Sequence, residues 1–295
     1  MATSCEFESR LGHQPPQVPD RAGRGESLRL HFAPQTDFNV RMAGFGVKIM
    51  VLVATVLLAG RPALADVTVA VAANFATTAQ KLATVFTAKT DQQVVIVTGS
   101  TGQLYAQIRN GAPYDLFLSA DAARIARLET DGALRPAGRK PYALGRLVLF
   151  GNDPKLIALG LRQALQSAAL RHLAVANPAL APYGAAARQV LDNLALGPEL
   201  DAKLVMGANV GQAFGFVRSG NAELGLVARG QVSGNDGRWI EVPRDLYSPV
   251  RQEAGLLRDT PVSRAFFAFL DSDAARDVIR AASYDVPACK AEPAE

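Results

Sequence analysis

The sequence predicts an α/β protein with two lobes, each a mainly parallel β-sheet flanked by helices, with two crossover strands between them. Short apolar strands alternate with helices along the chain, which is the pattern of an open parallel sheet. This alternation occurs in two tandem sets, and a late apolar segment at 248–257 would return the chain to the first set. We therefore expect the chain to pass between the lobes near Gly145 and near Tyr247.

The first set of elements begins just after residue 66, where β-branched residues and alanines alternate. The expected strands are 67–73, 94–98 and 116–118. The expected helices are 79–86, 103–110 and a third that Asp121 caps and that runs to Leu128.

The second set repeats this order of elements from residue 147 onward. The expected strands are 147–150, 173–176, 204–206 and 224–228, and the expected helices are 156–170, 184–196 and 210–219. After the returning strand, two more helices are expected at 261–270 and 272–282. We assign lobe I to 66–145 with 247–290, and lobe II to 146–246.

The N-terminal region predicts export. Lys48 precedes an apolar run at 49–59, and Ala63 and Ala65 form an A-x-A cleavage pattern. The run is too short for a membrane span, which needs about 20 residues. We expect a signal peptide at 42–65 that starts at Met42 and is cleaved after Ala65. Residues 1–41 are then either a non-native extension or a real disordered one.

Composition argues against several function classes. Lys and Arg total 31 against 27 Asp and Glu, and no basic cluster indicates a nucleic-acid partner. After cleavage, Cys289 and His172 are the remaining cysteine and histidine, so a Cys/His zinc cluster is excluded. A Ser-His-Asp arrangement would depend on His172 alone, so we expect no enzyme. No cysteine that could carry a lipid follows the cleavage site, which favours a free protein.

Small polar residues end several of the predicted strands and lead into helices. The four turns are Ala73-Asn74, 99–102, 182–184 and 209–211, and none contains Lys or Arg. A helix start offers unpaired N–H groups and the positive end of the helix dipole, which together bind anions. Each turn taken alone is better explained by helix capping, since Ser, Thr and Asn at strand ends are usually N-caps.

Several short strings stand at or beside these strand ends: VTVAVAANF at 67–75, GSTGQL at 99–104, GAPYDLFLSAD at 111–121 and APYG at 181–184, with Asn177-Pro178 and Asn209-Val210. Through these strings the chain resembles the periplasmic molybdate-binding proteins of ABC molybdate importers. The resemblance covers nearly all of 66–285. It implies the two-lobed periplasmic binding protein fold, with an oxyanion held in the cleft between the lobes.

The resemblance also implies the ligand contacts. They would be Asn74, Ser100 or Thr101, Tyr183 and the backbone N–H of Val210. Ala228 stands where some members have a tyrosine, and Tyr183 would supply the missing hydroxyl. Molybdenum would be present as the bound oxyanion, with no direct protein ligand and no further cofactor.

The implied function is capture of molybdate or tungstate by a monomer in the periplasm and delivery to the membrane permease of an ABC importer. A binding protein for another oxyanion or a small organic acid is one alternative, and a secreted enzyme is another. Asp115 and Asp121 are interpreted as turn and cap residues, because a carboxylate would repel a dianion. Trp239 is expected to pack within a lobe.

Overall fold

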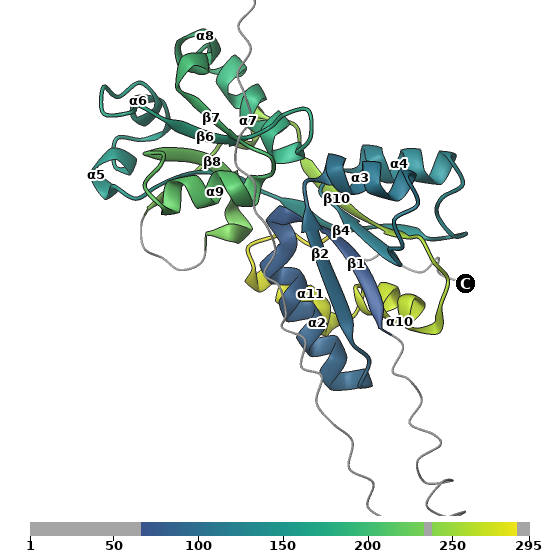
Figure 1. Ribbon diagram of the computed structural model, residues 1–295. Helices are drawn as coiled ribbons and strands as arrows, with labels where there is room; N and C mark the ends of the chain where they lie inside the picture. Colours follow the sequence, from purple (N-terminus) through teal and green to yellow (C-terminus); the bar gives the residue numbers. More distant parts are fainter. Residues whose placement is uncertain (1–65, 233–237, 288–295) are drawn as a thin grey trace, which may run out of the picture. The chain divides into compact units, whose positions relative to one another are not determined.

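Two five-stranded sheets organise the computed structural model, which describes residues 66–232 and 238–287 (Figure 1). The predicted extension at 1–41, the predicted signal peptide at 42–65 and Cys289 lie outside the described residues. Among the described helices, none is both long and apolar enough to cross a membrane.

The first sheet has the order β2-β1-β3-β10-β4. β1 pairs in parallel with β2 and β3, whereas β10 is antiparallel to both of its neighbours. In sheet order its strands are β2 (Val94–Gly99), β1 (Val67–Ala72), β3 (Leu116–Ser119), β10 (Val250–Leu256) and β4 (Arg139–Gly145).

The second sheet repeats this plan with the order β7-β6-β8-β5-β9. β6 pairs in parallel with β7 and β8, and β5 is antiparallel to β8 and β9. In sheet order its strands are β7 (Leu204–Gly207), β6 (Leu173–Ala176), β8 (Leu224–Ala228), β5 (Leu147–Gly151) and β9 (Trp239–Glu241). The predicted two-lobed α/β fold is therefore confirmed, with one strand in each sheet antiparallel to its neighbours.

Helices cover both faces of the first sheet, so its strands are buried on both sides. Val69 and Val71 of β1 pack with α2, α10 and α11, while Ala70 packs with α3 and α4 on the opposite face. These helices are α2 (Ala76–Thr90), α3 (Thr101–Arg109), α4 (Ala122–Thr130), α10 (Pro261–Phe269) and α11 (Asp273–Ala281).

The helices of the second lobe surround its sheet in the same way. Figure 1 shows α7 and α9 on opposite sides of this sheet, as right-handed crossovers in opposite directions require. The helices are α5 (Pro154–Ile157), α6 (Leu161–Leu165), α7 (Pro182–Asn193), α8 (Gly197–Leu200) and α9 (Val210–Arg218).

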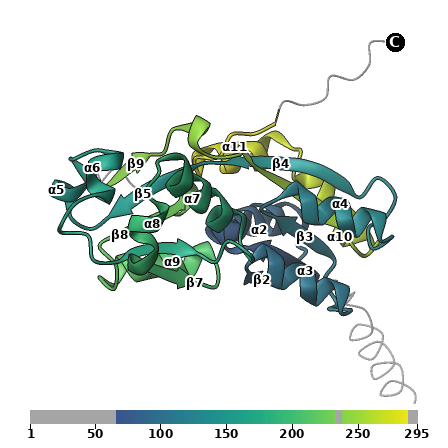
Figure 2. The same cartoon turned by 90° about the horizontal axis from the view of Figure 1, so that it is seen from above.

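The chain passes between the sheets twice. Arg146 alone separates β4 from β5, and the return runs from β9 to β10 through a short 3₁₀ turn at Arg244–Leu246 (Figure 2). The two passages are tied together, because the N–H of Leu147 donates to the Tyr247 hydroxyl over 3.1 Å. Arg146 also forms an ion pair with Asp285.

Three elements differ from the sequence expectation. The single helix expected at 156–170 is split into α5 and α6, since Gly160 between them has φ +85°, a left-handed conformation that ends a helix. Strands β4 and β9 were not predicted. Both are outermost in their sheets, and β4 carries charged and proline residues that hide its strand pattern.

Three tyrosines are buried where the two lobes join: Tyr142 on β4, Tyr284 after α11 and Tyr183 on α7. Burial, followed by the interaction with the Tyr284 hydroxyl, raises the pKa of both Tyr142 and Tyr183. Burial also raises the pKa of Tyr284, although its hydrogen bond with Asn74 acts in the opposite direction. All three phenols therefore stay protonated well into alkaline solution.

This burial predicts a particular alkaline instability. Below the unfolded tyrosine pKa of about 10, the phenols are protonated in both states and the free energy of unfolding does not depend on their titration. Above that pH the unfolded protein loses these protons more easily than the folded protein, so the free energy of unfolding falls as the pH rises. With three such groups, the free energy of unfolding should fall by about 4 kcal/mol per pH unit there. Urea unfolding between pH 8 and pH 11 measures this slope, and Tyr142→Phe should reduce it by about one third. A stability that does not change up to pH 11 would contradict the prediction.

Candidate functional site

Four strand-to-helix turns meet at one cavity between the lobes. Its free volume is about 10 Å³, close to the room that a single water molecule needs. Its lining includes the five residues singled out in the sequence, which are Asn74, Ser100, Thr101, Tyr183 and Val210. Each of them is at most 3% exposed, so the cavity is almost closed to solvent.

Two of the turns come from the first lobe. β1 ends at Ala72, and a 3₁₀ turn at Ala73–Phe75 leads into α2. β2 ends at Gly99, and α3 begins at Thr101. Because β1 and β2 are parallel neighbours, their carboxyl ends lie side by side and both helix starts point toward the cavity.

Ser100 has a structural task at the start of α3. Its hydroxyl accepts the N–H of Gln103 over 3.2 Å and donates to the Gln103 side-chain oxygen over 2.9 Å. The Ser100 N–H donates to the same Gln103 side-chain oxygen over 3.3 Å, which completes a capping box. The Ser100 hydroxyl is therefore already used as both donor and acceptor.

Thr101 has a different hydrogen-bonding state. Its hydroxyl oxygen accepts the Ala120 N–H over 3.3 Å, and no described residue takes the hydroxyl hydrogen. Its backbone N–H lies at the first position of α3, where a helix provides no internal partner. Of the two alternatives left open by the sequence, Thr101 is thus the one with free donors.

The other two turns come from the second lobe. α7 begins at Pro182 without a side-chain cap, so the N–H of Tyr183 in its first turn has no helical partner. Gly184 permits this tight turn, since a Cβ there would lie 2.3 Å from the Ala176 carbonyl oxygen. In α9, Asn209 caps the Gln212 N–H over 3.0 Å and leaves the Val210 N–H free at the first position.

The cavity carries no formal charge in its wall. None of the described residues that line it is Lys, Arg, Asp or Glu. Its electrostatic character comes instead from the N-termini of α3, α7 and α9, where the helix dipoles are positive. A site made of N–H and O–H donors alone suits an anion that accepts hydrogen bonds on every side.

Asn74 reaches the cavity with its donors already committed. Its carboxamide nitrogen donates to the Gln252 side-chain oxygen over 2.9 Å and to the Tyr284 hydroxyl over 3.2 Å. The Tyr284 hydroxyl in turn donates to the Asn74 carbonyl over 2.7 Å. The donor that Asn74 can still offer a ligand is its backbone N–H.

Tyr183 brings a free hydroxyl to the place where the lobes join. Within the described part of the chain this buried oxygen has no hydrogen-bond partner. It lies beside Gly145, where a Cβ would be 2.0 Å from it. A buried phenol without a partner costs about 1–3 kcal/mol, which indicates that another group completes it.

The lobes contact each other beside the cavity. The N–H of Gly102 in the first lobe donates to the Leu180 carbonyl of the second over 2.8 Å. Arg124 donates to the Ala179 carbonyl over 3.2 Å. These bonds hold the turns of the two lobes together around the cavity.

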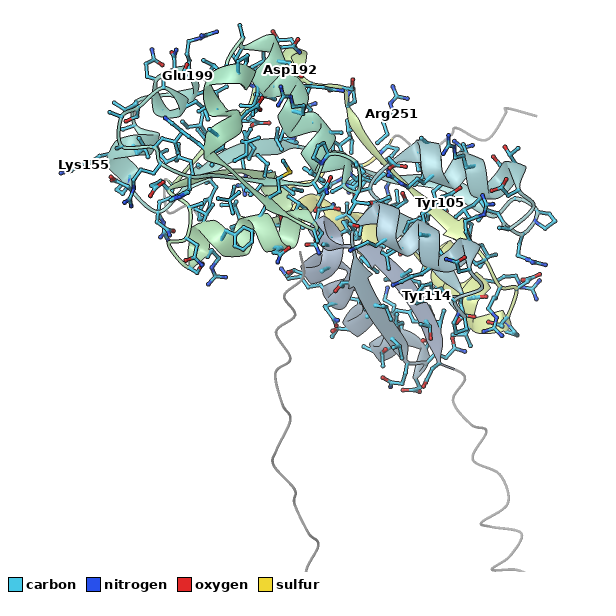
Figure 3. The ribbon with its side chains drawn as sticks, turned by 45° about the horizontal axis from the view of Figure 1, so that its top comes forward. Tyr105, Tyr114, Lys155, Asp192, Glu199 and Arg251 are labelled. Atoms are coloured by element: carbon cyan, nitrogen blue, oxygen red, sulfur yellow. The ribbon has the colours of Figure 1, made fainter. Side chains whose placement is uncertain are left out.

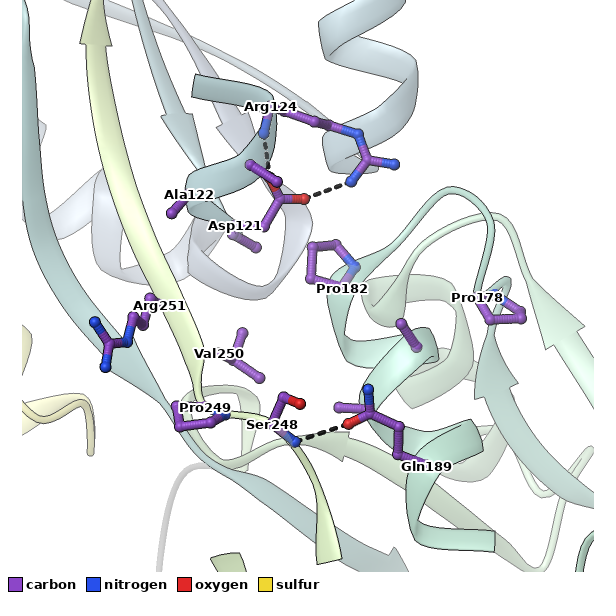
Figure 4. Close-up of a pocket in the computed structure, with 14 residues that line it drawn as sticks. Asp121, Ala122, Arg124, Pro178, Pro182, Gln189, Ser248, Pro249, Val250 and Arg251 are labelled. Carbon is purple, nitrogen blue, oxygen red and sulfur yellow. Dashed lines mark hydrogen bonds and ion pairs between the residues drawn. The ribbon is translucent and has the colours of Figure 1, made fainter. Parts of the chain in front are cut away.

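A larger hollow adjoins the cavity and shares Ala120 and Pro182 with it. Figure 4 shows two interactions among the residues that line it, one at Asp121 and one at Gln189. Asp121 forms an ion pair with Arg124, and Gln189 accepts the Ser248 N–H over 2.7 Å. Arg251 also lines the hollow and adds a further charged group to its wall.

Other residues singled out in the sequence have structural roles. Asp121 caps α4 by accepting the Arg124 N–H over 2.8 Å, as predicted. Asp115 was predicted to hydrogen-bond within its own turn. Its carboxylate instead accepts the Thr68 N–H of β1 over 2.7 Å. His172 lies in an exposed segment just before β6. Trp239 is half-buried in the second lobe, 4.1 Å from the Arg229 guanidinium.

Sequence reasoning missed Gln252, Tyr142 and Tyr284. Gln252 is fully buried, and Tyr142 donates to its side-chain oxygen over 3.0 Å. One signal was available, because Gln252 occupies the same phase of the returning strand as the buried Val250 and Ala254. No group of three or more metal-ligating side chains occurs in the described ranges.

Comparisons with known proteins agree with this architecture. Bacterial extracellular solute-binding proteins, as a family, match residues 67–285. The molybdate-binding protein ModA of Azotobacter vinelandii is 42% identical over 246 residues, which are 80% of this chain and 96% of that protein. ModA of Rhodobacter capsulatus is 40% identical over 74% of this chain and 88% of its own length.

Solved structures give the same result. The periplasmic molybdate-binding protein of Azotobacter vinelandii superposes with a TM-score of 0.72 at 37% identity, covering 75% of this chain and all of that one. The sulfate-binding protein SubI of Mycobacterium tuberculosis shares the fold, with a TM-score of 0.60 at 14% identity, and covers 75% of this chain and 86% of that one. By sequence match and by fold, the chain belongs to the family of bacterial extracellular solute-binding proteins.

Proposed function

We propose that this protein captures molybdate or tungstate in the cavity between its lobes and delivers the oxyanion to the membrane permease of an ABC importer. The observation that carries the proposal is the meeting of four helix-leading turns at a buried cavity whose wall has no charged side chain. The similarity to two proteins named for molybdate binding supports this ligand over other anions.

The proposed contacts are N–H and O–H donors from both lobes. The first lobe would contribute the backbone N–H groups of Asn74 and Thr101 and the Thr101 hydroxyl. The second lobe would contribute the N–H groups of Tyr183 and Val210 and the Tyr183 hydroxyl. Ser100 would act mainly by capping α3 and so by directing Thr101. Molybdenum would then be held through its oxygens, with no direct protein ligand.

Such a site selects by size and by protonation. A smaller tetrahedral anion such as sulfate leaves some donors without an acceptor, which costs about 1–3 kcal/mol for each unsatisfied group. Phosphate carries a proton near neutral pH, and a wall of donors provides no acceptor for it. Molybdate and tungstate have the same charge and nearly the same size, so we expect this site to bind both.

Capture would proceed by closure of the lobes. An oxyanion bound to the donors of one lobe would draw in the helix starts of the other, and the Gly102–Leu180 bond would form as water leaves. Removal of water strengthens each remaining hydrogen bond to the anion. The closed protein would then dock on the permease.

We also propose the wider setting of this activity. The partition of strands between two sheets supports lobe I at 66–145 with 247–290 and lobe II at 146–246. Export through a signal peptide cleaved after Ala65 would place a monomer, acting without a cofactor or catalysis, in the periplasm. Membership in an extracellular solute-binding family supports this location.

Calorimetric titration with four anions tests the ligand class. We expect one-to-one binding of molybdate and tungstate, with sulfate weaker by at least about 30-fold because two or more donors lose their acceptor. Phosphate should be excluded as strongly. Tight binding of sulfate or phosphate, with no heat from molybdate, would overturn the proposed ligand and leave the two-lobed binding protein.

Alanine substitutions at the start of α3 separate ligand contact from helix capping. Thr101→Ala removes a free hydroxyl donor, so molybdate affinity should fall about tenfold, and loss of the acceptor of the Ala120 N–H should lower the free energy of unfolding by about 1 kcal/mol. Ser100→Ala removes the cap, so the free energy of unfolding should fall by about 1 kcal/mol, with a smaller loss of affinity. Titration and thermal unfolding of both variants measure the two effects. The reverse pattern would assign the contact to Ser100.

A further inference from the structure

A buried amide links the two sides of the cavity. Gln252 lies on β10, the strand that returns the chain to the first lobe, and its side chain is fully buried. The neighbouring Arg251 extends outward from the same strand (Figure 3), as the alternation of side chains along a strand requires. Gln252 therefore points inward, toward the three buried tyrosines and Asn74.

The hydrogen bonds fix the orientation of both amides. The Tyr284 hydroxyl uses its single hydrogen on the Asn74 carbonyl, so the Asn74 group that contacts it must be the carboxamide nitrogen. That nitrogen also donates to Gln252, whose contacting atom must then be the oxygen. The Gln252 nitrogen is left on the opposite side of its amide.

That nitrogen lies near the Tyr183 hydroxyl, and neither group has a hydrogen-bond partner among the described residues. Both lie close to one point above Gly145, since a Cβ there would be 2.9 Å from the Gln252 nitrogen and 2.0 Å from the Tyr183 oxygen. A donor and an acceptor that are both buried and unpaired need only a small shift to bond each other. The absence of a side chain at Gly145 keeps the space between them open.

We infer that Gln252 is a positioning residue for oxyanion capture, which fixes Asn74 of the first lobe and donates to the Tyr183 hydroxyl of the second. When the Tyr183 oxygen accepts from Gln252, its own hydrogen turns away from Gln252 and is available to the anion. One amide thus aligns donors from both lobes. This inference rests on the proposed function, because it assigns a role within the same site.

A double-mutant cycle on the full chain tests the inference. Sodium molybdate is titrated into the wild type, Gln252→Met, Tyr183→Phe and the double variant. Gln252→Met and Tyr183→Phe should each weaken binding about tenfold, as expected for a buried hydrogen bond. The double variant should lose clearly less than the product of the two factors, because Gln252 acts partly through the Tyr183 hydroxyl.

The matched control is Ser263→Ala. Ser263 is a fully buried polar residue of the same lobe, and its hydrogen bonds are made to Arg258 and Thr260, outside the cavity lining. This control should lower the thermal midpoint, as Gln252→Met does, without changing molybdate affinity. An affinity of Gln252→Met within twofold of the wild type, or strictly multiplicative losses in the cycle, would overturn the inference.

A second variant covers the case in which Gln252→Met does not fold. Gly145→Ala keeps both side chains and places a methyl group between them, so binding should weaken by a similar factor. Unchanged affinity there would overturn the inference as well. If the wild type binds sulfate instead of molybdate, the same cycle with sulfate tests Gln252 while the proposed ligand alone is abandoned.

Discussion

Unpaired N–H groups at helix starts are the constraint on which the rest of this structure depends. Each parallel strand that enters the site ends at the same edge of its sheet, and the helix after it begins there with donors that the helix cannot satisfy. Two sheets place such edges face to face, so the donors of both lobes meet in one cavity. Burying these donors without an acceptor is costly, and an oxyanion is the ligand class that relieves this cost.

The neutrality of the wall follows from the same constraint. Backbone donors are fixed in direction by the helices that carry them, so they can be matched to the oxygens of a tetrahedral anion. A lysine or arginine would attract any anion and would add a flexible side chain to the site. Asp121 and Arg124, which line the larger hollow beside the cavity, are instead paired with each other.

The local part of this arrangement could be predicted from the sequence, and the non-local part could not. Asn74, Thr101 and Val210 follow apolar strands directly, so short-range patterns place them at helix starts. The proposal of Thr101 rather than Ser100 as the contact draws on the structure, because it depends on the hydrogen bonds that Gln103 and Ala120 make with the two hydroxyls. Strand β4 was missed because an edge strand tolerates charged and proline residues.

Gln252 shows why the second layer of the site is harder to predict. Its partners Asn74 and Tyr142 lie 178 and 110 residues away along the chain, and no short motif connects them. The sequence shows a polar residue at a buried position of a strand. This predicts that the residue makes a hydrogen bond but does not identify its partner. This strand follows directly after one of the two passages between the lobes. An amide buried there can therefore lie close to residues of both lobes. The connection between the lobes is thus also part of the support of the site.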